Sequence, residues 1–165
     1  MDPAADPHRR LIRPASPADD SALSVLVPDS DRRWWRFRYA AGSGETMLVA
    51  EADDEVCGVL SIRWNGGCDA PHPWLYGAAV LPALRGRGVG TALWLEAHQL
   101  CVVHGASHAS LDVSVENVAA RRPYERLGYM VLGPHEHSWV ARDESGEITG
   151  RGSADTWLMR CNLLA

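Results

Sequence analysis

The feature that most constrains this chain is a glycine-rich turn, Arg85-Gly86-Arg87-Gly88-Val89-Gly90-Thr91, which stands between a strand-like and a helix-like segment. The apolar segment 74–80 before the turn predicts a strand. In the segment 89–104, apolar residues recur at three- and four-residue spacing, which predicts a helix with one buried face. The first N–H groups of such a helix have no partner within it and lie at its positive end. The turn therefore predicts a site for an anion.

The turn by itself leaves its ligand open. Its glycines have no Cβ and let the backbone approach an anion closely, and Arg85 and Arg87 add positive charge. The glycine spacing does not fit the dinucleotide fingerprint GxGxxG, and the phosphate-loop pattern GxxxxGK[ST] is absent from the sequence. A glycine-rich connection between a strand and a helix also occurs for purely structural reasons.

The other segments predict a mixed α/β fold. Ser16-Pro17 is typical of a helix start, and Asp53-Asp54 indicates a hairpin turn between two strands. A crossover from a strand through a helix to a second strand makes strands 74–80 and 111–115 parallel neighbours. The further expected strands are 11–13, 46–52, 56–64, 129–132 and 156–163, and the further expected helices lie at 16–27, 34–39 and 117–127.

The length and composition bound the class of protein. A length of 165 residues is typical of a single domain, which we expect at 11–165. Residues 1–10 are expected to form a short mobile tail. The net charge of -5 argues against nucleic-acid binding, which needs a basic face. No apolar run reaches membrane-spanning length. The four cysteines lack metal-ligand spacing, so we expect no metal site, and their scatter favours a reducing cytoplasm.

A second motif stands downstream of the turn, namely Asn117-x-x-Ala120 followed by the run Tyr124-Glu125-Arg126-Leu127-Gly128-Tyr129. Together with the segment 80–90, this motif resembles the GCN5-related N-acetyltransferase (GNAT) family. The resemblance implies acetyl-CoA as co-substrate. It also implies a central mixed sheet of about six to seven strands flanked by helices, with strands four and five parallel and splayed apart.

The resemblance assigns the donor side of the reaction. The N–H groups of residues 86–91 would hold the CoA pyrophosphate, the edge of strand 78–80 would bind the pantetheine arm, and an N–H near Val80 would polarise the thioester carbonyl. Asn117 would contact the arm, cap its own helix, or do both. The residues predicted to bind acetyl-CoA are Ala78, Ala79, Val80, Arg85, Gly86, Arg87, Gly88, Val89, Gly90, Thr91 and Asn117.

Tyr124 matches the family tyrosine that protonates the departing thiolate, and a tyrosine is protonated at neutral pH. The alternative is that Tyr124 is a buried aromatic anchor. Tyr129 is expected to pack in the core. Pro123 departs from the family pattern, where a bulky apolar residue is usual, and it removes a helical hydrogen bond next to Tyr124.

Asp112 is the predicted base. Together with Ser114 and Glu116 it alternates along a strand and shares one face with them. Asp112 matches the carboxylate of relatives that acetylate ribosomal-protein N-termini, although it is shorter than their glutamate, which favours a water relay. The alternative is an ordinary strand residue. Glu51, His72, His135 and His137 are held in reserve as bases, and for each of them the alternative is an ordinary surface residue.

The predicted function is transfer of an acetyl group to a primary amine, either a small molecule or a peptide N-terminus. The alternative is a CoA-binding sensor or scaffold without turnover. A different nucleotide-binding domain is disfavoured by the antiparallel first half of the chain. The sequence leaves open whether strand 156–163 pairs across a homodimer. By the resemblance, Trp34 and Trp35 fall in the segment that forms one wall of the acceptor cleft, and Trp64 and Trp139 are candidates for positions near it. The alternative is that these tryptophans are core or cover residues.

Overall fold

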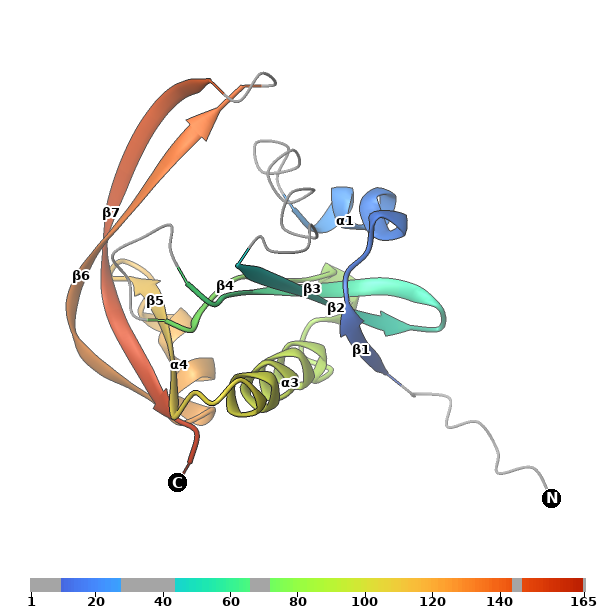
Figure 1. Ribbon diagram of the computed structural model, residues 1–165, viewed down its shortest axis with the longest axis horizontal. Coiled ribbons are helices and arrows are strands. Elements are labelled where there is room, and N and C mark those ends of the chain that lie inside the picture. The colour runs from blue at the N-terminus through green and yellow to red at the C-terminus, as the bar shows by residue number, and fades with distance from the viewer. Residues whose placement is uncertain (1–9, 28–43, 66–71, 144–146, 165) are drawn as a thin grey trace. The chain divides into compact units, whose positions relative to one another are not determined.

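The computed structural model describes residues 10–27, 44–65, 72–143 and 147–164 (Figure 1). In these ranges the strands follow the hydrogen-bonding order β1-β2-β3-β4-β5-β7-β6. β4 and β5 are parallel, with Trp74 opposite Ser110. The predicted mixed sheet is thereby confirmed. The strands are β1 (Leu11–Pro14), β2 (Glu45–Ala52), β3 (Glu55–Arg63), β4 (Trp74–Val80), β5 (His108–Ser114), β6 (Tyr129–Arg142) and β7 (Ile148–Asn162).

The chain divides into two compact units. The first comprises residues 1–62 and 77–97, and the second comprises residues 63–76 and 98–165. The helices are α1 (Asp20–Leu26), α3 (Val89–Val103) and α4 (Val118–Arg126), with short 3-10 turns at Pro17–Asp19 and Pro82–Leu84. None of the helices in the described ranges combines the length and the apolar character that crossing a bilayer requires. The helix expected at 34–39 lies outside the described residues, as do Trp34 and Trp35.

In the first unit, β2 and β3 form the predicted hairpin. Asp53 and Asp54 both adopt positive φ, 52° and 63°, which is the backbone geometry of a type I′ turn. α1 covers one face of this hairpin, where Leu23 is fully buried in a cluster with Met47, Val49 and Val59. Since side chains alternate along a strand, Gly58, the neighbour of Val59 in β3, faces the other side of the hairpin.

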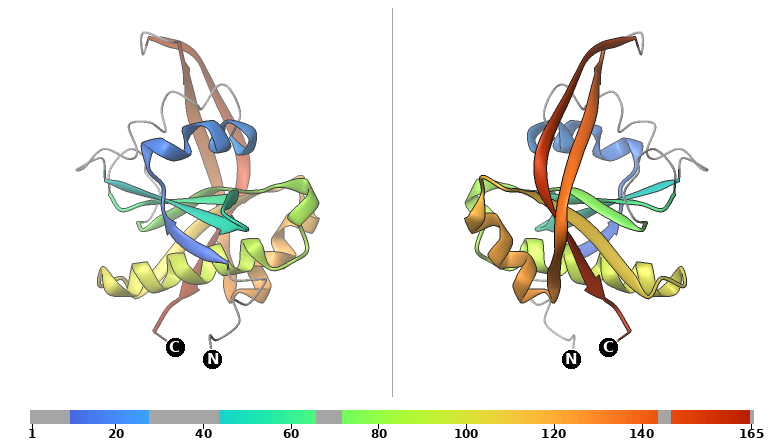
Figure 2. Two further views of the ribbon diagram at one scale, coloured as in Figure 1. Left: turned by 90° about the vertical axis from the view of Figure 1, so that its right-hand side faces the viewer. Right: turned by 90° about the vertical axis from the view of Figure 1, so that its left-hand side faces the viewer.

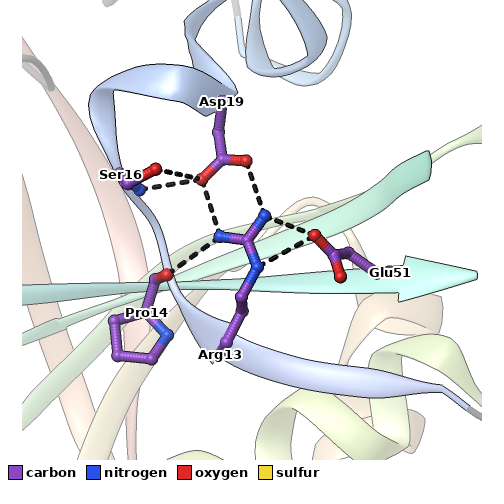
Figure 3. A network of polar contacts seen from close by, with 5 residues as sticks. All are labelled: Arg13, Pro14, Ser16, Asp19 and Glu51. Carbon is purple, nitrogen blue, oxygen red and sulfur yellow. Dashed lines mark hydrogen bonds and ion pairs between the residues drawn. The ribbon is translucent and has the colours of Figure 1, made fainter. Parts of the chain in front are cut away.

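β1 is tied to its neighbours by a network around Arg13 (Figure 3). The guanidinium donates to both oxygens of Asp19, at 2.8 and 2.7 Å, and also contacts the Glu51 carboxylate. The Arg13 hydrogen bond holds the pKa of the Asp19 carboxyl below its ordinary value. Asp19 in turn accepts the N–H of Ser16 at 2.8 Å, so the helix start predicted there is confirmed. Glu51, a candidate base, is held by Arg13.

α3 lies against the opposite face of β3 from α1, and Gly58 permits the contact. A Cβ added to Gly58 would lie 3.0 Å from both Val89 Cγ1 and Leu93 Cδ1. This distance is shorter than an ordinary carbon–carbon contact, which is about 3.5–4.0 Å. Because Gly58 has no side chain, the start of α3 and the turn before it can pack directly on β3.

In the second unit, β5, β7 and β6 pair antiparallel. Figure 2 shows β6 and β7 as one long twisted hairpin. They pair from Tyr129 opposite Cys161 to Arg142 opposite Ile148, whereas β5 pairs with β7 only from 156 to 162. The predicted strands at 129–132 and 156–163 were therefore too short. β6 is the outer strand of the sheet, so it accommodates the register shift at Val131/Gly133 and the proline at 134.

We expect Gly58→Val to lower the free energy of unfolding by about 1–3 kcal/mol, because its side chain would push against Val89 and Leu93. Urea denaturation measures the loss. Gly150→Val is the matched control in another strand, since a Cβ there would meet Ala141 Cβ at an ordinary 3.7 Å. Equal losses in the two variants would show that the approach of α3 is not the cause.

Candidate functional site

The predicted anion site lies in the first unit, at the start of α3. Gly86 and Gly88 have φ of 71° and 82°, and Arg87 between them does not have positive φ. This alternation resembles the backbone nests that bind anions. The N–H of Arg85 donates to Pro82 O, and the N–H of Ala92 donates to Gly88 O. The N–H groups of 86–91 stand between these two bonds, in the turn where a helix start leaves donors without intrahelical partners.

Three arginines lie at this donor loop, which we define as residues 85–91: Arg85, Arg87 and Arg10. Arg85 Nε donates to the carbonyl oxygen of Val80 at 3.0 Å, so its side chain stabilises the C-terminal end of β4. Arg10 was assigned to the tail, yet its Nη1 lies 3.1 Å from where a Cβ of Gly88 would stand. Arg10 therefore brings positive charge to the loop, and its sequence position before β1 carried no signal of this.

The predicted pantetheine strand, 78–80, follows an irregularity in β4. Gly77 has φ of 67° inside the strand, a conformation that glycine adopts without strain. Gly77 and Ala78 are exposed, and Ala79 and Val80 are half-buried. Beyond this point the N–H of Leu81 donates to Cys57 O at 2.9 Å, which keeps the end of β4 attached to β3. A lone glycine in a strand pattern was the available signal for this irregularity.

The predicted acid and base lie in the second unit. Tyr124 is half-buried on α4, and burial raises the pKa of its phenol, with a further contribution from the Asp112 carboxylate. The structure therefore brings Tyr124 and Asp112 close enough to interact electrostatically. A raised pKa keeps the phenol protonated, which suits a proton donor. α4 runs through Pro123 without a break.

Asp112 faces His137 of β6. Its Oδ2 lies 3.1 Å from His137 Nδ1, and the Asp112 side chain is 14% exposed. The Asp112 contact raises the pKa of His137. β5 ends at Ser114, so Glu116 does not continue the strand face as predicted. Its N–H instead donates to Ser114 Oγ at 3.3 Å, in the turn after β5.

The remaining predicted residues have structural contacts. Tyr129 is 2% exposed, and its hydroxyl lies 2.8 Å from His98 Nε2, so it packs in the core as predicted. Asn117 Oδ1 accepts the N–H of Ala120 at 3.1 Å, which confirms the helix cap. Its contact with CoA stays a prediction. Trp64 stacks on His104 with ring centroids 4.1 Å apart.

Among the described residues, no group of three or more His, Cys, Asp or Glu side chains is arranged to hold a metal ion. Cys57, Cys101 and Cys161 are buried free thiols, and Cys68 lies outside the described ranges. Burial raises the pKa of the Cys101 thiol to about 12. Protonated, buried thiols of this kind are poor nucleophiles.

Comparisons with known proteins agree with this arrangement. The acetyltransferase (GNAT) family model matches residues 10–129. Mycothiol acetyltransferase of Nocardia farcinica is 34% identical over 131 residues, which are 75% of this chain and 36% of that protein. Aminoglycoside N(6′)-acetyltransferase type 1 of Stenotrophomonas maltophilia is 30% identical over 129 residues, 72% of this chain and 84% of that protein.

A solved aminoglycoside 6′-N-acetyltransferase complexed with coenzyme A has a TM-score of 0.66 at 17% identity, with 94% of this chain and 98% of that chain covered. This similarity confirms the predicted fold. The chain spans about a third of the length of two of the relatives that it matches.

We expect Asn117→Ala to lower the free energy of unfolding by about 0.5–2 kcal/mol, because the Ala120 N–H loses its cap. Thermal or urea unfolding measures this loss, and Asn117→Ser should recover most of it. The acetyl-CoA affinity of the serine variant then separates the two roles. An unchanged affinity would leave Asn117 as a cap alone.

Proposed function

Because the chain belongs to the acetyltransferase (GNAT) family, whose members use acetyl-CoA, we propose that it transfers the acetyl group of acetyl-CoA to a primary amine. The amine attacks the thioester directly, without a covalent enzyme intermediate. The observation that supports this most is the donor loop, which combines positive φ at Gly86 and Gly88 with a row of N–H groups at the start of α3. Such a row suits a pyrophosphate.

In the proposed donor half, the N–H groups of 86–91 bind the pyrophosphate, and Arg10 and Arg87 add positive charge. The exposed stretch of β4 at Gly77 and Ala78 receives the pantetheine arm along 78–80. An N–H near Val80 stabilises the negative charge that develops on the thioester oxygen. Arg85 serves mainly to hold the loop against Val80 O.

In the proposed acceptor half, Tyr124 protonates the thiolate of CoA as the carbon–sulfur bond breaks. Asp112 takes part in accepting the proton of the amine. An alkylammonium has a pKa near ~10 and no lone pair, so it must lose a proton before it attacks. The interaction of Tyr124 with Asp112 in the second unit supports placing these two roles together.

We propose a small-molecule amine or a peptide N-terminus as the acceptor. The similarity to an enzyme named for aminoglycosides supports the first class. Buried free thiols support a cytoplasmic location, where thiols stay reduced. A thiol-release assay with acetyl-CoA tests the proposal, using an aminoglycoside, a peptide with a free N-terminus and an aromatic monoamine. Tight binding of acetyl-CoA without turnover of any amine would favour a sensor instead.

Gly88→Val should weaken acetyl-CoA binding by at least about tenfold, since a side chain at positive φ is strained and would meet Arg10. Calorimetric titration with acetyl-CoA measures the affinity, and unfolding curves check that the variant is folded. Gly150→Val, near the start of β7, is the control. Normal binding by Gly88→Val would mean that the loop is not the CoA site.

Tyr124→Phe should lower kcat by about 10²–10⁴-fold, the usual contribution of general acid catalysis, while the acetyl-CoA affinity stays the same. Phenylalanine keeps the ring that packs edge-on at 6.3 Å from Tyr129. Steady-state kinetics with the best amine of the panel measures kcat. Wild-type turnover in this variant would leave Tyr124 as a packing residue.

A further inference from the structure

A carboxylate and an imidazole stand opposite one another on one face of the second unit. Asp112 lies on β5 opposite Leu158 of β7, and His137 lies on β6 opposite Ala154. Side chains in these positions share a face, because they are separated by an even number of residues along paired strands. Asp112 Oδ2 and His137 Nδ1 are 3.1 Å apart, so the two side chains meet over β7, which lies between their strands.

The contact places one ring nitrogen of His137 next to the carboxylate. Nδ1 is the ring nitrogen at ion-pair distance from Asp112 Oδ2, 3.1 Å, and this oxygen makes no hydrogen bond of good geometry within the described residues. A neutral ring that carries its proton on Nδ1 presents its donor to the carboxylate and leaves Nε2 with a free lone pair. Among the described residues, no partner of Nε2 is found. The His137 side chain is 41% exposed, so this nitrogen is accessible to a substrate.

An aromatic face lies next to His137. The Trp139 and His137 rings are 6.0 Å apart and inclined by 31°. The Trp139 indole lies directly on its cross-strand partner Gly152, where an added Cβ would come within 2.4 Å of the ring. Gly152 thus leaves room for the indole over β7. Trp139 remains 49% exposed, and an exposed indole face attracts cations such as an ammonium.

We propose that His137 Nε2 is the atom that takes the proton of the acceptor ammonium, with Asp112 as the residue that positions and charges the imidazole. This inference rests on the proposed acetyl transfer and assigns its base to the histidine rather than to the carboxylate. Trp139 guides the ammonium to Nε2. The arrangement resembles other dyads in which a carboxylate orients a catalytic imidazole.

The ammonium gives one proton to Nε2, and the amine lone pair then bonds to the thioester carbon. As the carbon–sulfur bond breaks, sulfur takes the Tyr124 proton. The second proton of the former ammonium returns through water to the tyrosine oxygen. Nε2 finally releases its proton to solvent, so one proton is released for each amide formed.

The charged groups around His137 determine its titration. Asp112 raises the pKa of His137, while burial and the positive charge of Arg63 on β3 lower it, and the net direction is upward. Tyr124 on α4 is near the same carboxylate and is protonated at neutral pH. A raised pKa favours the imidazolium, so the base is present only above the pKa of His137. We therefore expect kcat/KM to rise with pH through a value above 6.5.

The variant His137→Asn tests the base. Its amide N–H can still donate to Asp112, but no basic nitrogen remains. We expect kcat/KM for the amine to fall by about 10²–10⁴-fold and the acidic limb of the pH profile to disappear, with unchanged calorimetric affinity for acetyl-CoA. His108→Asn, a histidine of β5 beside Ser107, is the matched control and should retain wild-type kinetics.

NMR titration provides a readout without an acceptor. The His137 imidazole signal, identified by its loss in His137→Asn, should titrate at a lower pH in Asp112→Asn than in the wild-type protein. An unchanged pKa would overturn the pairing. If amines are acetylated but His137→Asn keeps the wild-type rate and pH profile, the base assignment fails and the acetyl transfer stands. If no amine is acetylated, the proposed function fails, whatever the titration shows.

Discussion

The close approach of α3 to β3 at Gly58 is the contact on which the donor loop depends. With no side chain at this point, Val89 and Leu93 come to the surface of the strand. Val89 is the first residue of α3, so the same contact fixes where the row of N–H groups begins. A helix start that is held by a buried strand can present its amides without reorganisation, which is what binding a polyphosphate requires.

The second unit organises its polar residues differently, through strand pairing. In the long hairpin of β6 and β7, His137 contacts Asp112 across the intervening strand β7, and Trp139 packs on Gly152. β7 serves as the spacer in both cases. Because the side chains are set by register, a slip of one residue would turn each of them to the other face. The chemistry assigned to this face therefore depends on the hairpin as a whole.

Local patterns determined most of the elements. The strand at 74–80, the helix from 89 and the hairpin at Asp53-Asp54 each carry their own periodicity or turn chemistry, and all were predicted within a few residues. The hairpin of β6 and β7 was underestimated because Gly133-Pro134 and the glycines of β7 are locally unfavourable for strands. Cross-strand pairing over the full length outweighs that preference, and a single sequence does not display pairing.

The sequence by itself identified the family and predicted the anion-binding loop, because the turn at 85–91 and the motif at 117–129 are each a continuous segment and stand at the separation that the family shows. Only the tertiary structure decided which residues meet from distant segments. Arg10 reaches Gly88, Glu51 is held by Arg13, and His137 rather than solvent faces Asp112. These contacts join residues far apart in the chain, and their geometry is set by packing and strand register rather than by local sequence.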